Sequence, residues 1–196
     1  MNAVFLSASV PDPRRDPRYY GTADLVAIRD AVRALATVLL PHSTLHWGGH
    51  PAITPLIRAV TESMGVTEAD RIRLFQSAWY SDRLPQDNVA FESYKLTDRG
   101  NNKEESLEIM RQAIMESAPF YAGIFIGGME GVEAEFDLFR QRHPKATLLP
   151  IASTGGAALL TFQQHRSALK LPVELLTEYA YPSLFRRLLN LPSTST

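Results

Sequence analysis

Four short segments of small residues recur along this chain, and each directly follows an apolar run that is typical of a buried β-strand. They are residues 7–9, 48–50, 127–131 and 153–156. The last three segments each precede a stretch with the apolar spacing of an α-helix. Strands that alternate with helices favour a parallel sheet covered by helices on both faces. This arrangement predicts an α/β fold.

The apolar pattern also predicts the individual elements. Strands are expected near residues 4–6, 44–47, 71–75, 121–126 and 146–151, and helices near residues 22–39, 53–64, 102–114 and from 132 onward. Asn102 and Glu105 resemble a helix-capping pair. Residues 81–99 are polar and are expected to form a long loop with a short strand near Phe91. The proline-rich residues 11–20 are expected to form a rigid loop that acts as a lid or contacts a partner. Together these elements predict a three-layer, Rossmann-like, doubly wound parallel sheet.

The length and apolar content of the chain favour one domain. The chain has 196 residues, of which 45% are hydrophobic, which is enough for one sizeable core. We predict a single domain over residues 1–196 with its core in about residues 3–160. Residues 170–196 carry many Leu and aromatic residues, which predicts a helical segment that packs on the sheet or on a partner subunit. A homodimer and packing within the chain are both compatible with this segment.

Composition excludes several functions. The chain has 20 basic and 21 acidic residues and a net charge of −1, so we expect no nucleic-acid partner. It has no cysteine, which excludes disulfides, thiolate metal sites and a cysteine nucleophile. The five histidines lack metal-binding spacing, so no metal and no cofactor is predicted. The N-terminal segment lacks a basic leader and no apolar stretch could span a bilayer, which predicts a cytoplasmic protein without a membrane partner.

The four small-residue segments are the candidate binding site. In an open parallel sheet, the carboxyl ends of all strands lie at one edge, and ligands bind where the strand order reverses. Glycine lets the backbone approach a ligand closely, and helix N-termini attract anions. The predicted ligand-binding residues are Ser7, Ala8, Ser9, Gly48, Gly49, His50, Gly127, Gly128, Met129, Glu130, Gly131, Ser153, Thr154 and Gly155. The alternative is that these residues only turn and cap the chain.

None of these segments has a Rossmann G-x-G-x-x-G or P-loop pattern, which argues against an ordinary dehydrogenase or kinase. Instead, residues 125–135 resemble the P-G-G-x-G-T-x-x-E signature of the lysine-decarboxylase-like LOG proteins, which belong to the SLOG superfamily. Residues 4–9 and 46–49 are similar to the first two strands of that family and their turns. The resemblance covers most of residues 3–160.

The resemblance implies a nucleotide-related ligand. LOG enzymes cleave the N-glycosidic bond of nucleoside monophosphates, whereas other SLOG domains bind nucleotide-derived signals, including cyclic ADP-ribose-like molecules in bacterial antiphage systems. This chain departs from the enzyme signature at three points. Ile126 replaces the proline, one residue is inserted before Gly131, and Val132 replaces the phosphate-contacting threonine. These departures favour a sensor over a competent LOG enzyme.

Three carboxylates crowd the start of the helix that follows this signature. Glu130, Glu133 and Glu135 suit the helix dipole but would repel a bare phosphate. Ionised carboxylates only accept hydrogen bonds, so they suit ribose hydroxyls better. A phosphate is instead expected at the glycine turn of residues 48–49, or at two arginines of the proline-rich loop, Arg14 and Arg18.

Two side chains have specific candidate roles. Glu135 aligns with the glutamate of the family signature and is the predicted catalytic or ribose-binding residue, the alternative being an ordinary N-terminal helix acid. His50 follows two glycines at a helix start, where it could bind phosphate or ribose, or merely cap the loop.

Two functions follow from these predictions. The first is a sensor of a nucleotide or NAD-derived molecule that acts through a separate effector protein or through oligomerisation. The alternative is an enzyme, a nucleotide N-glycosidase or related ribosyl-transfer enzyme that uses Glu135. Both predict that Gly128→Val blocks the cleft while leaving the fold largely intact.

Overall fold

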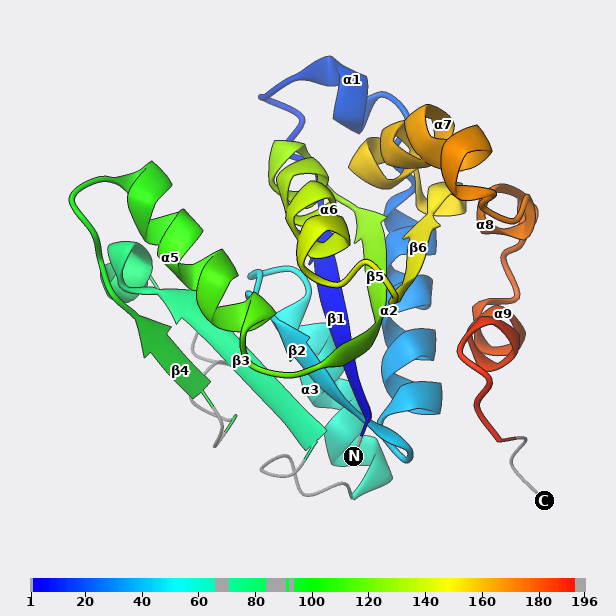
Figure 1. The fold of residues 1–196 in the computed structure, drawn as a ribbon, viewed down its shortest axis with the longest axis horizontal. Coiled ribbons are helices and arrows are strands. Elements are labelled where there is room, and N and C mark those ends of the chain that lie inside the picture. The colour runs from blue at the N-terminus through cyan, green and yellow to red at the C-terminus, as the bar shows by residue number, and fades with distance from the viewer. Residues whose placement is uncertain (1, 66–70, 84–90, 92–93, 193–196) are drawn as a thin grey trace.

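The fold is built around one parallel β-sheet. The computed structural model describes residues 2–65, 71–83, 91 and 94–192. The six strands are β1 (Asn2–Ser9), β2 (Ser43–Trp47), β3 (Ile72–Ser77), β4 (Tyr94–Thr97), β5 (Phe120–Gly127) and β6 (Thr147–Ile151). Their order in the sheet is β4-β3-β2-β1-β5-β6, and every neighbouring pair is parallel (Figure 1).

The strand order reverses beside β1. The chain first adds β2, β3 and β4 on one side of β1 and then returns to place β5 and β6 on the other side. In an open α/β sheet, such a reversal leaves a crevice at the carboxyl ends of the two central strands. The predicted doubly wound, Rossmann-like fold is therefore confirmed.

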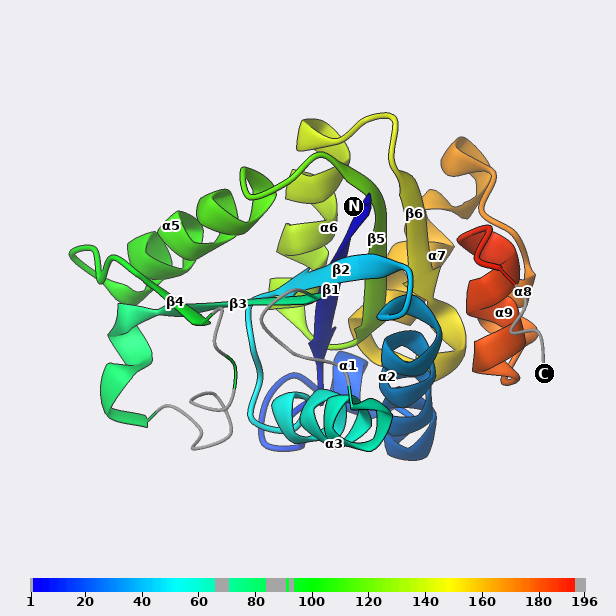
Figure 2. The same ribbon diagram turned by 90° about the horizontal axis from the view of Figure 1, so that it is seen from below.

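Helices cover both faces of the sheet. Helices α2 (Leu25–Leu39) and α3 (Thr54–Met64) lie on one face, and α5 (Lys103–Met115) and α6 (Glu130–Arg142) lie on the other (Figure 2). Successive side chains of β1 alternate between these faces, as a strand requires. Val4 and Leu6 belong to the core cluster of α2, whereas Phe5 belongs to the cluster of α6. The result is a three-layer structure.

Local signals set the helix starts. The Asp24 side chain accepts a hydrogen bond from the N–H of Ala27 and begins α2. The Asn102 side chain accepts from the N–H of Glu105, and the Glu105 carboxylate accepts in return from the N–H of Asn101. The predicted capping pair is thus confirmed.

Some local predictions were wrong. Residues 7–9 end strand β1 instead of forming a turn. The proline-rich loop contains a short helix, α1 (Pro17–Tyr20), because Pro17 suits the first helical position and the Asp16 carboxylate caps the N–H of Arg18. The short strand expected near Phe91 is β4, three residues later, where it pairs with β3. Much of the predicted loop lies outside the described residues, apart from the 3-10 helix η1 (Ala78–Arg83).

The C-terminal segment packs on its own chain. After β6 follow the 3-10 helix η3 (Ala152–Thr154), α7 (Gly156–Leu169), α8 (Glu174–Thr177) and α9 (Tyr181–Leu188). Helix α9 packs against α2, and its buried side chains Tyr181, Leu184 and Phe185 join the core cluster of that face. Among the described residues, no helix has the length and apolar character needed to cross a membrane.

Candidate ligand-binding site

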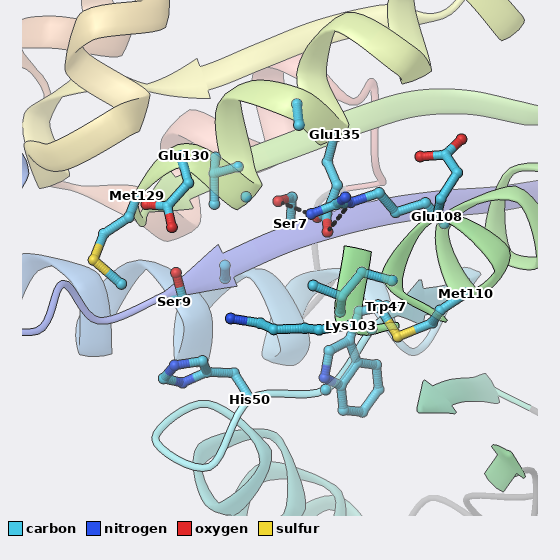
Figure 3. A pocket seen from close by; sticks show the side chains of 18 of the residues that line it. Ser7, Ser9, Trp47, His50, Lys103, Glu108, Met110, Met129, Glu130 and Glu135 are labelled. Carbon is cyan, nitrogen blue, oxygen red and sulfur yellow. Dashed lines mark hydrogen bonds and ion pairs between the residues drawn. The ribbon is translucent and has the colours of Figure 1, made fainter. Parts of the chain in front are cut away.

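A cavity of about 900 Å³ opens at the carboxyl edge of the sheet. Its walls come from the ends of β1 and β2, the first turn of α6 and one side of α5 (Figure 3). It therefore lies beside the strand-order reversal between β1 and β5, where the fold predicts a ligand. Its size falls within the range of small-molecule sites.

The structure brings together most of the predicted site residues at this cavity. Those that line it are Ser7, Ala8, Ser9, Gly48, Gly49, His50, Met129, Glu130, Gly131 and Glu135. They come from three separate segments that are far apart in the sequence. The carboxyl ends of parallel strands bring them to one edge of the sheet.

The fourth segment does not line the cavity. Ser153, Thr154 and Gly155 lie instead at a junction within the protein. The Thr154 hydroxyl accepts from the N–H of Gly127 at 2.9 Å, and the Ser153 hydroxyl is 3.1 Å from the hydroxyl of Tyr181. These hydrogen bonds tie the end of β5 to the C-terminal helices. At this segment the small residues turn and cap the chain, which is the alternative to ligand binding.

Gly127 and Gly128 also do not line the cavity. At Gly128, φ is +80° and a Cβ atom would lie 2.2 Å from Cγ2 of Val132. Any side chain at this position would disturb the turn between β5 and α6. The prediction that Gly128→Val would block the cleft and leave the fold intact is therefore wrong.

The first turn of α6 presents backbone donors to the cavity. Its N-cap residue is Met129, which supplies no side-chain cap. The N–H groups of Glu130 and Gly131 have no hydrogen-bond partner within the described ranges. By contrast, the N-terminus of α7 is occupied by the protein itself, because the N–H of Gly156 donates to the Thr22 hydroxyl. Of these two helix starts, only that of α6 faces a ligand-sized space.

Glu135 is held in the cavity wall by two partners. The Ser7 hydroxyl donates to Oε2 at 2.6 Å, and Nε of Arg111 donates to Oε1 at 3.4 Å (Figure 3). The side chains of Arg111 and Glu135 are only 16% and 17% exposed. Burial raises the pKa of Glu135, while Arg111 and the Ser7 hydrogen bond act in the opposite direction. The net result is a raised pKa and a carboxyl group that protonates more readily than an exposed glutamate.

Each of the three crowded carboxylates has an arginine partner. Glu130 pairs with Arg15, Glu133 pairs with Arg18 at 3.2 Å, and Glu135 pairs with Arg111. Two of these arginines come from the loop of residues 11–20, which therefore packs over the first turn of α6. These pairs offset the repulsion that the sequence predicts for a phosphate at this helix start.

Sequence reasoning missed several residues of the cavity. Arg15 lines it, whereas the predicted phosphate contacts Arg14 and Arg18 do not. Arg14 pairs instead with its near neighbour Asp12. The larger omission is α5, which contributes Lys103, Glu104, Glu105, Leu107, Glu108, Met110 and Arg111. No local motif marks this helix as part of the site, because only its packing against the sheet brings it there.

His50 presents a hydrogen-bond donor to the cavity. Its Nδ1 accepts from the N–H of Ala52 at 3.2 Å, so the neutral ring carries its proton on Nε2. Burial lowers the pKa of His50, which favours this neutral form. In the part of the chain that the structure describes, no three His, Asp or Glu side chains form a cluster that could hold a metal ion.

A parallel sheet of this topology with a ligand-sized cavity at its reversal point defines a Rossmann-like ligand-binding domain. The model of the SLOG cluster3 family matches residues 18–189, so the chain belongs to this family. The resemblance found in the sequence is confirmed, and membership indicates a nucleotide-related ligand-binding or LOG-like domain. None of the curated proteins compared with the chain matches it.

Proposed function

We propose that this protein is a sensor that binds a nucleotide or an NAD-derived molecule in the cavity between β1, β2, α5 and α6. One observation carries the proposal. Three segments predicted to bind ligand, distant in sequence, converge on a single space of about 900 Å³. The sheet topology brings these segments to one edge, and a binding role accounts for the ligand-sized cavity that lies between them.

The chemistry of the walls suits such a ligand. Glu130 and Glu108 can accept hydrogen bonds from ribose hydroxyls, and the N–H groups at the start of α6 can donate to a polar ligand atom. Leu6, Leu107 and Met110 offer an apolar surface for a base. A site of this kind combines apolar area with a few directed polar groups, as small-molecule sites generally do.

The departures from the enzyme signature support sensing. Val132 is a buried aliphatic residue beside Gly128, where the LOG signature has a threonine, and it has no hydroxyl to offer a phosphate. Glu130, next to the inserted position, pairs with the loop residue Arg15. A homodimer, a separate effector and a role in antiphage signalling stay predictions from the sequence.

The alternative function is a nucleotide N-glycosidase, and one observation favours it. The buried carboxyl of Glu135 is fixed by Ser7 and Arg111 at the cavity wall, and its pKa is raised. A carboxyl of this kind can donate a proton to a leaving base or stabilise an oxocarbenium ion. Glu135→Gln should then abolish release of free base while leaving ligand binding in place.

Gly131→Met is expected to abolish ligand binding and preserve the fold. Within the described part of the chain, a Cβ atom at Gly131 would meet only Nη2 of Arg111, at 3.7 Å, so a longer side chain can extend into the cavity. The measurement is the thermal midpoint with NAD, ADP-ribose, cyclic ADP-ribose isomers, AMP and CMP. A ligand at about 100 times its Kd adds roughly 2.7 kcal/mol to the wild type, a shift of about 5–10 °C. The Gly131→Met variant should show no shift.

Gly131→Ala is the matched control, because it adds one methyl group at an ordinary contact distance. It should keep most of the ligand-induced shift. Chromatography of each mixture separates the two functions, because a shift without released base indicates a sensor and a shift with released base indicates a glycosidase. An unchanged shift in the Gly131→Met variant would place the ligand outside this cavity.

A further inference from the structure

The cationic side chains of the cavity differ in whether a partner holds them. Arg15 and Arg111 are each paired with a glutamate of α6. Lys103 also lines the cavity, and no ion pair or hydrogen bond engages its ammonium group within residues 2–65, 71–83, 91 and 94–192. Its charge is therefore available to a ligand, whereas the charges of Arg15 and Arg111 are already offset.

The position of Lys103 is unfavourable for the helix that carries it. Lys103 is the first residue of α5, where the positive end of the helix dipole disfavours a cation. Acidic residues follow at Glu104 and Glu105, as this end of a helix prefers. Local helix stability does not explain a lysine at this position, but a contact with an anion in the cavity would.

The groups around Lys103 are donors without partners. Figure 3 shows its side chain extended across the cavity toward the side where Ser9 and His50 lie. His50 presents the N–H of its Nε2, and no described residue accepts a hydrogen bond from the Ser9 hydroxyl. The Lys103 ammonium group, the His50 N–H and the Ser9 hydroxyl can all donate hydrogen bonds, so they suit an anion.

We propose that Lys103, together with His50 and Ser9, forms an anion subsite that binds a phosphate group of the ligand, on the side of the cavity away from Glu135. This inference rests on the proposed function and adds an orientation to it. The phosphate lies against Lys103 and the ends of β1 and β2, and the ribose hydroxyls lie against the carboxylates of α6. The ligand class is therefore a phosphorylated nucleoside or a dinucleotide fragment whose ribose hydroxyls are free to donate hydrogen bonds.

Lys103→Gln tests the subsite. The probes are AMP, ADP-ribose and the uncharged nucleoside adenosine, each titrated by calorimetry into the full chain. Loss of a charge-assisted contact to phosphate should lower the affinity for AMP and ADP-ribose by roughly 10- to 100-fold. The affinity for adenosine should stay within about twofold of the wild-type value. The weakening should shrink at high ionic strength, because salt screens the lysine–phosphate attraction.

Lys145→Gln is the matched control. Lys145 is exposed and precedes β6, so it lies at the edge of the sheet opposite to the cavity. This variant should bind all three probes as the wild type does. Lys103→Arg should keep most of the affinity for AMP, because the positive charge remains.

The outcomes separate the subsite from the cavity. The anion subsite is overturned if the Lys103→Gln variant keeps the wild-type preference for AMP over adenosine. It is also overturned if the affinities for AMP and adenosine fall by the same factor. In both cases the proposed function stands. If the wild type binds none of the probes, the proposed function fails and the subsite fails with it.

Discussion

Gly155→Ala is expected to destabilise the protein by about 3 kcal/mol or more, although Gly155 does not touch the cavity. Gly155 has φ +70° and ψ −158°, a conformation that is almost exclusive to glycine. A Cβ atom there would lie 1.9 Å from the backbone oxygen of Thr22. Backbone cannot rotate away as a side chain can, so the segment before α2 would have to move. The thermal midpoint should fall by roughly 6–12 °C.

Gly65→Ala is the control for this prediction. Gly65 also has a positive φ, +60°, but a Cβ atom there meets no atom of the described residues within 4 Å. Its cost is therefore limited to backbone strain of about 1 kcal/mol. If both variants lose the same stability, the close approach of Gly155 to Thr22 is not what requires glycine.

Arg111→Met is expected to cost about 3 kcal/mol near pH 8, because it leaves Glu135 buried without its cationic partner. Arg111 lowers the pKa of Glu135 in the folded protein, so its removal raises that pKa further. Unfolding then releases a proton at any pH between the unfolded and folded pKa values. The loss of unfolding free energy is absent below the pKa of Glu135 in the unfolded chain. It grows as the pH rises toward the pKa of Glu135 in the folded variant. Urea unfolding at pH 5 and pH 8 measures the difference.

A double variant identifies the cause of this loss. Adding Glu135→Gln to Arg111→Met removes the unpaired charge, and the amide can still contact Ser7. The double variant should regain most of the stability at pH 8 and lose the pH dependence. An Arg111→Met variant that is equally destabilised at both pH values would mean that Arg111 acts through packing of its long side chain instead.

The fold could be predicted from the sequence because its signals are local. Apolar runs such as residues 121–126 lie in strands, and the capping pair of Asn102 and Glu105 begins α5 as expected. The strand near Phe91 was misplaced, because β4 is a short edge strand whose one buried residue is the polar Thr97, while the apolar Leu96 is exposed, so its sequence carries no apolar pattern.

The site could be predicted only in part. The ends of β1 and β2 follow from the general rule for parallel sheets, and ten of the predicted residues line the cavity. The wall formed by α5 could not be predicted, because Lys103 and Arg111 belong to no motif and reach the cavity only through helix packing. The segment of residues 153–156 resembles a binding turn in sequence, yet its polar groups bond to the protein itself.

The junction at residues 153–156 connects two distant parts of the molecule. Thr154 holds the N–H of Gly127, directly before the turn that leads into the first turn of α6, while the adjacent Ser153 contacts Tyr181 at the start of α9. The N–H of Ala157 also bonds to the carbonyl of Gly128. A shift of the β5–α6 turn on ligand entry would therefore strain bonds that anchor the C-terminal helix. Hydrogen bonds thus link the turn beside the cavity, through residues 153–157, to α9 at the outer edge of the molecule.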